Sequence, residues 1–394
     1  MPGPLAPYQT TRLTWGSHIL HHCNSYNLCS GHAAPACVSR PDGFHEDYPD
    51  TRTTTAPMMA SWSEKMLQLL LRMNNFHLPA ANKQNRFASP TGSILETCLR
   101  FEVAGEHVGW VTPGVACILA RFPNVFCARG GAVALAADLD SCEKRSEAVG
   151  AALQELREHG CLTCLRGWRS EKYAVMARYC DSPLMHMERA ATSKYSRVFG
   201  VKRYGVHING YSRDGDGNLS MWIARRSNTK QTYPGKLDNL AAGGLAAGCS
   251  IKHTLVKECQ EEACIPESLA EKARPVGTIS YTYEDEEGVF PECQFVFDLE
   301  LPTNFRPQIG DGEVQAFYFY PINKVKELLV CEEFKPNCAM VVLDFLIRHS
   351  VIEPDSGLEY GTGQTPTLPC QANSSHCVSV PRTVSSSSCN NSKN

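Results

Sequence analysis

The stretch GGLAAGCSIKHTLVKECQEEACI, residues 243–265, constrains the fold of this chain more than any other. A glycine-rich segment opens it, and the apolar spacing that follows predicts an amphipathic helix with a hydroxyl residue as its cap. At the geometry of an α-helix, Glu258, Glu261 and Glu262 lie within about 100° of one another and share one side. Because carboxylates at this spacing repel each other, the pattern predicts either a solvated acidic face or a site for a cation.

The segments around this stretch predict a mixed sheet with helices packed on it. Strand-like runs precede and follow the helix, at residues 203–211, 219–227, 275–301 and 313–322, and two more helices end the pattern, at 323–330 and 337–349. Turn residues separate the first two runs, as in SRDGDGN. We therefore expect residues 201–352 to form an α+β domain whose sheet lies between helices.

The preceding residues, 62–200, predict a smaller mixed α/β domain. SWSEKMLQLLLRMNN, residues 61–75, has apolar residues at helical spacing, with Ser63 as the expected cap. CLRFEVAGEHVGWV reads as a hairpin with an Ala-Gly turn, and helical patterns follow at 114–121 and 143–158. Three roles stay open for this domain: covering a substrate, forming the interface of a homodimer, or binding another ligand.

Both ends of the chain lack a sustained apolar period, so we expect a disordered leader at 1–57 and a disordered tail at 354–394. The histidines and cysteines of the leader have no paired ligand spacing, which favours a flexible segment over a metal site. The net charge of −3 gives no basic excess for nucleic acid, and no apolar run reaches the ~20 residues of a membrane span. We expect a cytoplasmic protein, with organellar targeting by the leader left open.

The cysteines are numerous, but their placement argues against disulfides. The chain has 19, an odd number, and many lie in segments patterned as core. Cys161 and Cys164 have CxxC spacing without a second pair at the spacing of a zinc site, which favours structural residues. We expect the cysteines to be reduced.

The glycine-rich loop followed by KECQEE resembles the Nudix box, Gly-x5-Glu-x7-Arg-Glu-U-x-Glu-Glu-x-Gly-U, where U is aliphatic. Aligning Glu258, Glu261 and Glu262 with the metal-binding glutamates of the box puts Gly243 on its first glycine and Ile265 on its last aliphatic position. The resemblance implies hydrolysis of a diphosphate linked to another group, with Mg²⁺ or Mn²⁺ as the cofactor.

Three positions depart from that pattern. In Nudix proteins the first glutamate and the arginine of the box are structural partners that brace the loop, and Cys249 and Lys257 stand in their places here. A lysine lacks the planar fork of arginine, so the loop is expected to be held less rigidly. Cys264 stands where the box has a glycine, so the helix must end without the freedom that glycine provides. None of the three removes a metal ligand.

Further segments are similar to one Nudix subfamily, the group called thiamin pyrophosphokinase-related. They include FGVKRYGVHINGY, KQTYPGKLDNLAAGG and GTISYTYEDEEGVFPECQFVFDLEL. Members carry an extra N-terminal domain of unknown function, which residues 62–200 resemble. Members from fungi and plants are linked to hydrolysis of thiamine diphosphate analogues, notably damaged oxo and oxy forms, to the monophosphate. The resemblance implies that substrate and a Nudix fold in which a mixed sheet is sandwiched between helices.

The resemblance and the local patterns together give a set of expected site residues. Glu258, Glu261 and Glu262 are expected to hold the metal, and one of them or Glu313 is expected to act as the base. Residues expected to contact the substrate are glycines of the loop, cationic side chains for phosphate and aromatic rings for stacking: Gly243, Gly244, Arg225, Arg226, Lys230, Lys236, Trp222 and Tyr233. His207 is expected to be an ordinary strand residue.

Two other functions stay open from the sequence. A Nudix hydrolase could act on a nucleoside diphosphate derivative with the same chemistry. The departures at Cys249, Lys257 and Cys264 are also compatible with a Nudix-fold module that binds a ligand without catalysis. The intact glutamate triplet favours an enzyme acting on a small-molecule diphosphate.

Overall fold

The computed structural model describes residues 60–77, 97–162, 165, 168–190, 196–285 and 288–352. The expected leader and tail, Cys164 of the CxxC pair, and Glu286 and Glu287 within the strand-like run 275–301 lie outside the described residues. The described residues from Ser61 onward belong to one compact unit.

The N-terminal domain is built on a four-stranded sheet with the order β2-β1-β4-β3. Its elements are β1 (Leu99–Val103), β2 (Glu106–Val111), α3 (Pro113–Leu119), β3 (Phe126–Arg129), β4 (Ala132–Leu135) and α4 (Cys142–Glu158). The expected hairpin is β1–β2, and Ala104 and Gly105 form its turn with φ of 52° and 84°. Strands β1 and β4 run parallel, with α3 between them in the chain.

A separate hairpin follows in the same domain. Strands β5 (Trp168–Val175) and β6 (Met185–Ala190) pair antiparallel, and the short helix α5 (Ser196–Phe199) leads to the next domain. Tyr173, Val175, Met185 and Met187 join the hydrophobic core that α4 and the four-stranded sheet enclose. The hairpin is therefore fixed to the N-terminal domain by apolar burial.

The C-terminal domain contains a seven-stranded mixed sheet with the main order β11-β12-β7-β8-β13. Its strands are β7 (Arg203–Arg213), β8 (Leu219–Arg226), β9 (Leu237–Asp238), β10 (Ala241–Gly244), β11 (Arg274–Asp285), β12 (Gly288–Glu300) and β13 (Val314–Pro321). Strands β7 and β12 pair in parallel from Arg203 opposite Glu292 to Tyr211 opposite Glu300. The strand β10 pairs with β7 on the way into the glycine-rich loop.

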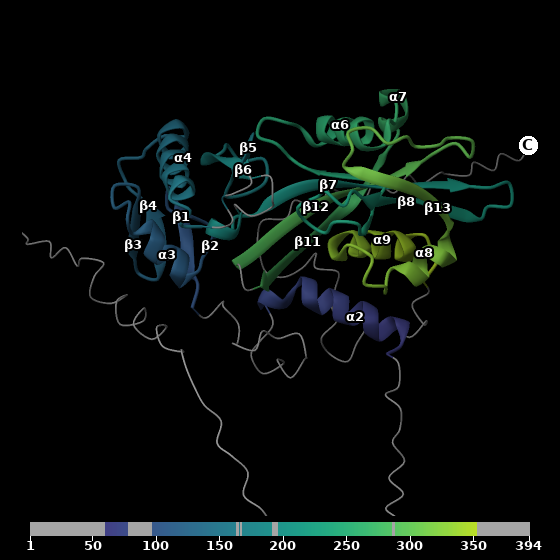
Figure 1. The fold of residues 1–394 in the computed structure, drawn as a ribbon, viewed down its shortest axis with the longest axis horizontal. Helices are drawn as coiled ribbons and strands as arrows, with labels where there is room; N and C mark the ends of the chain where they lie inside the picture. The colour runs from purple at the N-terminus through teal and green to yellow at the C-terminus, as the bar shows by residue number, and fades with distance from the viewer. Residues whose placement is uncertain are drawn as a thin grey trace, which may run out of the picture. The chain divides into compact units, whose positions relative to one another are not determined.

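Helices cover both faces of this sheet, as Figure 1 shows. Helix α6 (Ile251–Ala263), followed by α7 (Glu267–Ala270), packs on one face over a core that includes Val206 and Leu299. Helices α8 (Ile322–Leu328) and α9 (Pro336–Arg348) pack on the other face. The fold is thus the expected mixed sheet between helices, preceded by a smaller α/β domain.

The first described helix differs from its prediction in two respects. It is α2 (Trp62–Met73), followed by the 3-10 turn η1 (Asn75–His77), and its cap is Ser61 because a capping box pairs Ser61 with Glu64. Residues 62–200 were expected to form one domain, but Met66 and Met73 of this helix are buried in the cores under α9 and β11. Helix α2 therefore packs on the C-terminal domain (Figure 1).

Two expectations from composition concern the chain as a whole. Every cysteine within the described ranges is a free thiol. Among the helices of the described residues, none is both long and apolar enough to cross a bilayer.

Candidate active site

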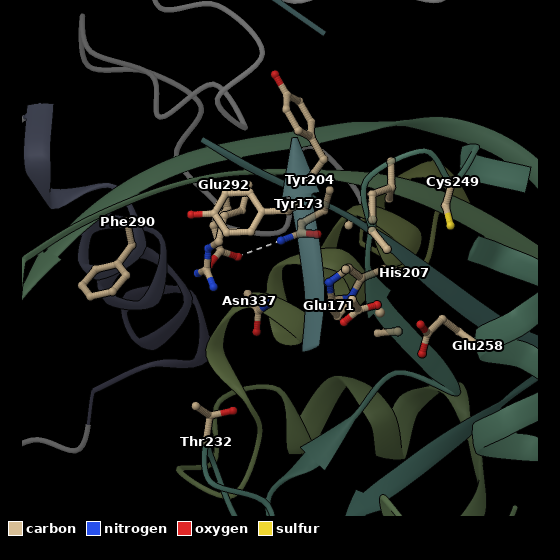
Figure 2. A pocket seen from close by; sticks show the side chains of 18 of the residues that line it. Glu171, Tyr173, Tyr204, His207, Thr232, Cys249, Glu258, Phe290, Glu292 and Asn337 are labelled. Atoms are coloured by element: carbon tan, nitrogen blue, oxygen red, sulfur yellow. Dashed lines mark hydrogen bonds and ion pairs between the residues drawn. The ribbon is translucent and has the colours of Figure 1, made fainter. Parts of the chain in front are cut away.

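A cavity of about 960 Å³ lies at the glycine-rich loop and α6. Its lining includes expected site residues, namely Gly243, Gly244, Glu258, Glu261, Glu313, Arg226 and Tyr233. Another part of the wall comes from β11 and β12, with Tyr281, Tyr283, Phe290, Glu292 and Gln294. Strand β5 of the N-terminal domain adds Glu171 and Tyr173. Figure 2 shows both with Glu258 and Glu292 among the lining side chains.

Helix α6 begins and ends as its sequence requires. The Ser250 hydroxyl accepts a hydrogen bond from the His253 amide at 3.1 Å, which caps the first turn. Cys264 ends the helix in the left-handed conformation, with φ 51° and ψ 35°. The amide of Ile265 then donates to the Cys259 carbonyl at 3.0 Å. The helix therefore ends in the left-handed conformation that the glycine of the Nudix box would provide. Cys264 adopts it at a higher conformational free energy than glycine would.

Glu258 lies against the backbone of the glycine-rich loop. A Cβ atom placed on Gly243 would be 2.0 Å from the Glu258 carboxyl carbon, so only glycine leaves room for this carboxylate. The Lys257 ammonium lies 3.6 Å from a Glu258 oxygen, and 13% of the Glu258 side chain is exposed. The first glycine of the loop thus fixes where the Glu258 carboxylate can be.

Glu262 is buried beside Glu258. Its carboxylate accepts a hydrogen bond from the Ala242 amide at 2.9 Å, and only 7% of the residue is exposed. Burial, followed by the negative charges of Glu258, Asp238 and Glu313, raises the pKa of Glu262 well above its ordinary value. Several carboxylates therefore share a small volume with too little positive charge to balance them.

Glu261 faces a different direction from its two partners. Nearly half of its side chain is exposed, and its carboxylate pairs with Lys257 at 3.1 Å. Its backbone carbonyl accepts from the Asp311 amide at 2.9 Å, and Gly310 packs so closely on that carbonyl that a Cβ would lie 1.9 Å away. Glu261 thus helps to dock the loop that carries Glu313.

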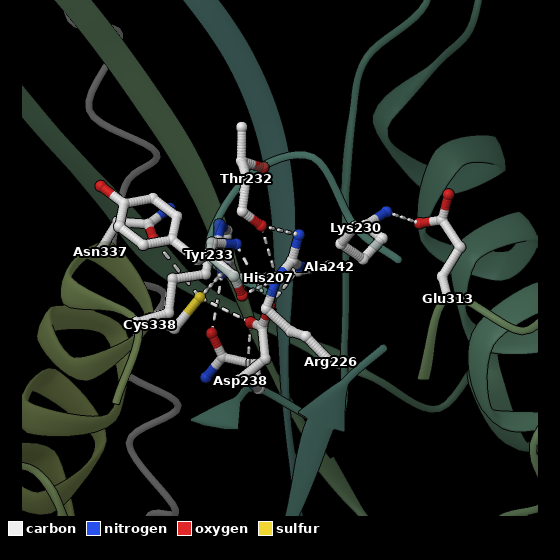
Figure 3. Close-up of polar contacts among 12 residues, drawn as sticks. His207, Arg226, Lys230, Thr232, Tyr233, Asp238, Ala242, Glu313, Asn337 and Cys338 are labelled. Atoms are coloured by element: carbon white, nitrogen blue, oxygen red, sulfur yellow. Dashed lines mark hydrogen bonds and ion pairs between the residues drawn. The ribbon is translucent and has the colours of Figure 1, made fainter. Parts of the chain in front are cut away.

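Lysines lie beside the carboxylates of the cavity. The Lys230 ammonium forms an ion pair with Glu313, drawn in Figure 3. Burial lowers the pKa of Lys257, but Glu258, Glu261 and Glu171 outweigh it, so the pKa of Lys257 is raised. Within the described ranges, no group of three or more His, Cys, Asp or Glu side chains is arranged to hold a metal ion.

The residues at this end of the cavity nevertheless have the chemistry for a hard divalent cation. Glu258, Glu261, Glu262 and Glu313 offer only carboxylate oxygens, which Mg²⁺ and Mn²⁺ prefer. Burial first and the neighbouring carboxylates second raise the pKa of Glu262, and such a cation would offset the charge of those carboxylates. The donor set therefore fits the cofactor that the sequence predicts.

Arg226 lies at the cavity, but its donors are used within the protein. It pairs with Asp238 at 2.8 Å and donates to the carbonyls of Thr232 and Tyr233, as Figure 3 shows. Lys335 joins Asp238 at 3.2 Å. Burial raises the pKa of Asp238, but the charges of Lys335 and Arg226 outweigh it, and the pKa is lowered. Arg226 therefore holds the loop between β8 and β9 in place.

Three expected substrate contacts lie away from the cavity lining. Trp222 is buried in the core under α6, with its ring 4.7 Å from that of Phe319. Arg225 pairs with Glu333 at 3.0 Å, and the Lys236 ammonium donates to the Glu332 carbonyl. The alternation along β8 separates Arg225 from Arg226, and an apolar core explains Trp222 without a ligand.

The sequence did not single out several residues that the cavity contains. Glu171 and Tyr173 belong to another domain, and no local motif marks them. Glu292 is held by Arg203 and by the Tyr281 hydroxyl at 2.5 Å, an arrangement that depends on strands far apart in the chain. His207, expected to be structural, is buried and contacts Asn239 at 2.8 Å.

Two family models match most of the described chain. A model described as "Domain of unknown function (DUF4743)" matches residues 75–203, and a model described as "NUDIX domain" matches residues 203–337. The second match contains the glycine-rich loop, α6 and Glu313.

Two curated plant proteins from Arabidopsis thaliana are similar over both domains. Nudix hydrolase 24, chloroplastic, is 39% identical over 259 residues, which are 65% of this chain and 69% of that protein. Nudix hydrolase 20, chloroplastic, is 36% identical over 285 residues, 70% of this chain and 73% of that protein.

Among solved structures, an Ap4A hydrolase from C. elegans is 15% identical, with a TM-score of 0.28, covering 37% of this chain and 98% of that one. The family assignment rests on the sequence relatives and on the matched Nudix domain. The chain belongs to the Nudix hydrolase family and is an enzyme that hydrolyses a pyrophosphate bond.

Proposed function

We propose that this enzyme hydrolyses thiamine diphosphate, or an oxidised analogue of it, to the monophosphate with Mg²⁺ or Mn²⁺ as the cofactor. The observation that carries the proposal is that one cavity has carboxylates at one end and aromatic side chains in its wall. An organic diphosphate has both features that this cavity would recognise, a charged chain and a flat ring.

At the carboxylate-rich end, Glu258, Glu261 and Glu262 would hold the metal. The bound metal would neutralise phosphate charge and acidify a water molecule. Gly243 and Gly244 line the cavity, so the loop backbone would lie beside the diphosphate. Glu313 would accept the proton of the attacking water, and its ion pair with Lys230 keeps its carboxylate oriented.

At the other end, aromatic side chains would hold the ring of the substrate. Tyr283 and Phe290 are stacked with their centroids 4.6 Å apart, and Tyr233 also lines the cavity. Glu292 also lines this wall, where Arg203 balances its charge and the Tyr281 hydroxyl donates to it, so the wall offers polar groups beside the rings. The homodimer that the sequence left open is not part of this proposal.

Formation of the monophosphate products with Mg²⁺ from a panel of diphosphates, separated by chromatography, tests this function. The panel contains thiamine diphosphate, its oxo and oxy analogues, ADP-ribose and a nucleoside diphosphate. We expect the thiamine compounds to give the highest kcat/KM, and Glu258→Gln to lower it by at least about 100-fold because a metal-binding carboxylate is lost.

The matched control is Glu267→Gln on α7, an exposed glutamate whose loss should leave turnover unchanged. Unchanged activity in Glu258→Gln would remove the metal-site assignment. Turnover restricted to the nucleotide compounds would replace the thiamine class by the nucleotide class.

We also propose a cytoplasmic location. The free thiols of the described cysteines support a reducing compartment. The two plant relatives are named as chloroplastic, so fractionation of cells that express the full chain is the deciding measurement, and recovery in an organelle would contradict the proposal.

A further inference from the structure

The feature behind this inference is a series of hydrogen bonds that leads from Asp298 to His207. Asp298 pairs with Arg348 and accepts a hydrogen bond from the side-chain NH₂ group of Asn209 at 3.1 Å. The side-chain oxygen of Asn209 accepts from the NH₂ group of Asn239 at 3.2 Å. The side-chain oxygen of Asn239 lies 2.8 Å from Nδ1 of His207. All four linked side chains, from Asp298 to His207, belong to buried residues.

The carboxylate at one end fixes the direction of every bond in this series. Beside Arg348, Asp298 is ionised and can only accept, so Asn209 presents its NH₂ group to Asp298 and its oxygen to Asn239. Asn239 then presents its own oxygen to His207, so Nδ1 carries the proton and donates. The other ring nitrogen, Nε2, is therefore an acceptor. His207 lines the cavity (Figure 2), and no donor among the described residues reaches Nε2.

Gln294 is oriented by a second carboxylate. Its NH₂ group donates to Glu292 at 2.8 Å and to the Tyr281 hydroxyl at 3.3 Å. The Tyr281 hydroxyl gives its own proton to Glu292 at 2.5 Å, so it can only accept from Gln294. The Gln294 oxygen therefore lies on the other side, over Gly205, where a Cβ atom would be 2.4 Å from it. Gln294 also lines the cavity, and its oxygen accepts no hydrogen bond from the described part of the chain.

These two acceptors lie on the face of the sheet that carries the aromatic wall. In the pairing of β7 with β12, Gly205 is opposite Gln294 and His207 is opposite Val296. Because side chains two residues apart share a face, His207 and Gln294 lie on the same face as Phe290, with His207 about 7 Å beyond Gly205. Only 4% of His207 and 6% of Gln294 is exposed, so a ligand is the natural source of a donor for each. Phosphate oxygens are acceptors themselves, which excludes the diphosphate as that ligand group.

We infer that His207 and Gln294 are specificity-determining residues, which accept hydrogen bonds from N–H groups of a heterocycle held at the aromatic wall. The inference rests on the proposed function, because thiamine compounds carry an N–H group on their pyrimidine ring. A heterocycle without an N–H group would leave both acceptors unpaired in the complex, so the enzyme should discriminate against it.

The tautomer of His207 is measured first, in the full-length chain labelled with ¹⁵N-histidine. Two-bond ¹H–¹⁵N correlations in an NMR spectrum show which ring nitrogen carries the proton, and the signals that are missing from His207→Leu identify the residue. We expect a proton on Nδ1 and none on Nε2. A proton on Nε2 would overturn the inference.

A pair of substrates then tests the recognition of N–H groups. Thiamine diphosphate and its deamino analogue differ only in the amino group of the pyrimidine. We expect the kcat/KM of the wild type to be at least about tenfold higher for the amino compound, and this ratio to fall at least about threefold in His207→Leu and in Gln294→Leu. Because the ratio compares two substrates on one sample, partial misfolding of a variant does not change it. His253→Leu and Gln260→Leu, at exposed positions of α6, are the matched controls and should keep the wild-type ratio.

Equal kcat/KM of the wild type for the two compounds would overturn the inference, and so would a wild-type ratio in both variants. Equal loss of kcat on both compounds in His207→Leu would assign that residue to catalysis and also overturn it. If no thiamine compound is hydrolysed, the proposed function fails. Calorimetric dissociation constants for ADP-ribose and its analogue with unsubstituted purine then decide the inference, which falls if the amino compound is not preferred.

Discussion

The space at Gly243 shows how one residue sets the position of a catalytic group. Replacing Gly243 by alanine would put a Cβ atom 2.0 Å from the Glu258 carboxyl carbon. Because the Glu258 side chain is flexible, it would turn aside and the fold would survive. We expect Gly243→Ala to lower kcat/KM by at least about tenfold, with a change in thermal midpoint of no more than a few degrees.

Gly215→Ala is the matched control for that substitution. Gly215 lies in the turn between β7 and β8, where an added Cβ would have nothing within 4 Å. Equal activity of Gly243→Ala and Gly215→Ala would mean that the position of the Glu258 carboxylate does not matter for turnover.

At this scale the sequence predicted the helix and its cap, and the side on which the glutamates lie. It did not predict that Glu262 would be buried against the Ala242 amide while Glu261 faces Lys257, because that depends on how β10 and the 310–313 loop pack on the helix. The sequence led us to expect Arg226 at the phosphate. It did not reveal the partner of Arg226, because Asp238 lies 12 residues further along the chain and on a different strand.

Among the elements, α9 is fixed to β12 by a charged cluster around Asp298. Arg348 lies 2.5 Å and His349 2.9 Å from its carboxylate, and Asn209 donates at 3.1 Å. Burial raises the pKa of Asp298, but the hydrogen bonds from His349 and Arg348 outweigh it, so the net pKa is lowered. The cluster therefore favours the ionised carboxylate in the folded state.

The sign of this shift predicts a pH dependence. A carboxyl group with a lowered folded pKa stabilises the protein above its unfolded pKa, about 3.9, and loses that contribution as the pH falls through the folded value. We expect Asp298→Asn to lower the free energy of unfolding at pH 7 by about 2 kcal/mol and to make it less sensitive to acid.

Urea denaturation between pH 7 and acidic pH measures both effects. Glu327→Gln on α8 removes an exposed glutamate that pairs with Lys324, and it serves as the control with little change expected. If Asp298→Asn and wild type differ in free energy of unfolding by the same amount at every pH, the lowered pKa of Asp298 does not contribute to stability.

The element pattern was largely predictable because each strand and helix has its own apolar period. The helices expected at 143–158 and 337–349 occur as α4 and α9, within a residue or two at their ends. The cap of α2 is Ser61 and not the expected Ser63, because the Glu64 side chain accepts from the Ser61 amide in a capping box. Which strands pair with each other could not be predicted, because the apolar period of a segment does not identify its neighbour in the sheet.

For the molecule as a whole, the segment that leads from the first domain into the second packs closely on β2 at two glycines. A Cβ atom on Gly109 of β2 would lie 2.1 Å from the Phe199 carbonyl oxygen. Gly200 has φ of 51°, and a Cβ there would lie 2.7 Å from the Trp110 carbonyl. Backbone thus packs on backbone where α5 leads into the C-terminal domain.

We expect Gly109→Ala to destabilise the protein by about 1–3 kcal/mol, because backbone atoms on both sides must separate to admit the methyl group. Urea denaturation gives the stability, and limited proteolysis of the native chain should show faster cleavage near residues 196–203. Gly114→Ala, whose Cβ would meet nothing within 4 Å, is the control. Identical proteolysis of Gly109→Ala and wild type would contradict close packing of this segment on β2.

The arrangement of the domains is what the sequence could least predict. The helical period of α2 does not say which domain it packs on, and its burial against α9 and β11 comes from a surface formed more than 200 residues later. Likewise, Glu171 reaches the catalytic cavity only because a hairpin of the first domain lies beside a loop of the second. Such contacts depend on tertiary packing.

The parallel pairing of β7 with β12 has a consequence for how the chain is made. Each paired residue of β7 finds its partner 89 positions later, so the centre of the sheet cannot close until the ribosome has passed residue 300. The N-terminal domain, with its local hairpins, can be complete well before then. The growing chain therefore has a folded first domain followed by β7, whose edge stays unpaired until β12 is made. Strand β5 is already folded when the glycine-rich loop is synthesised.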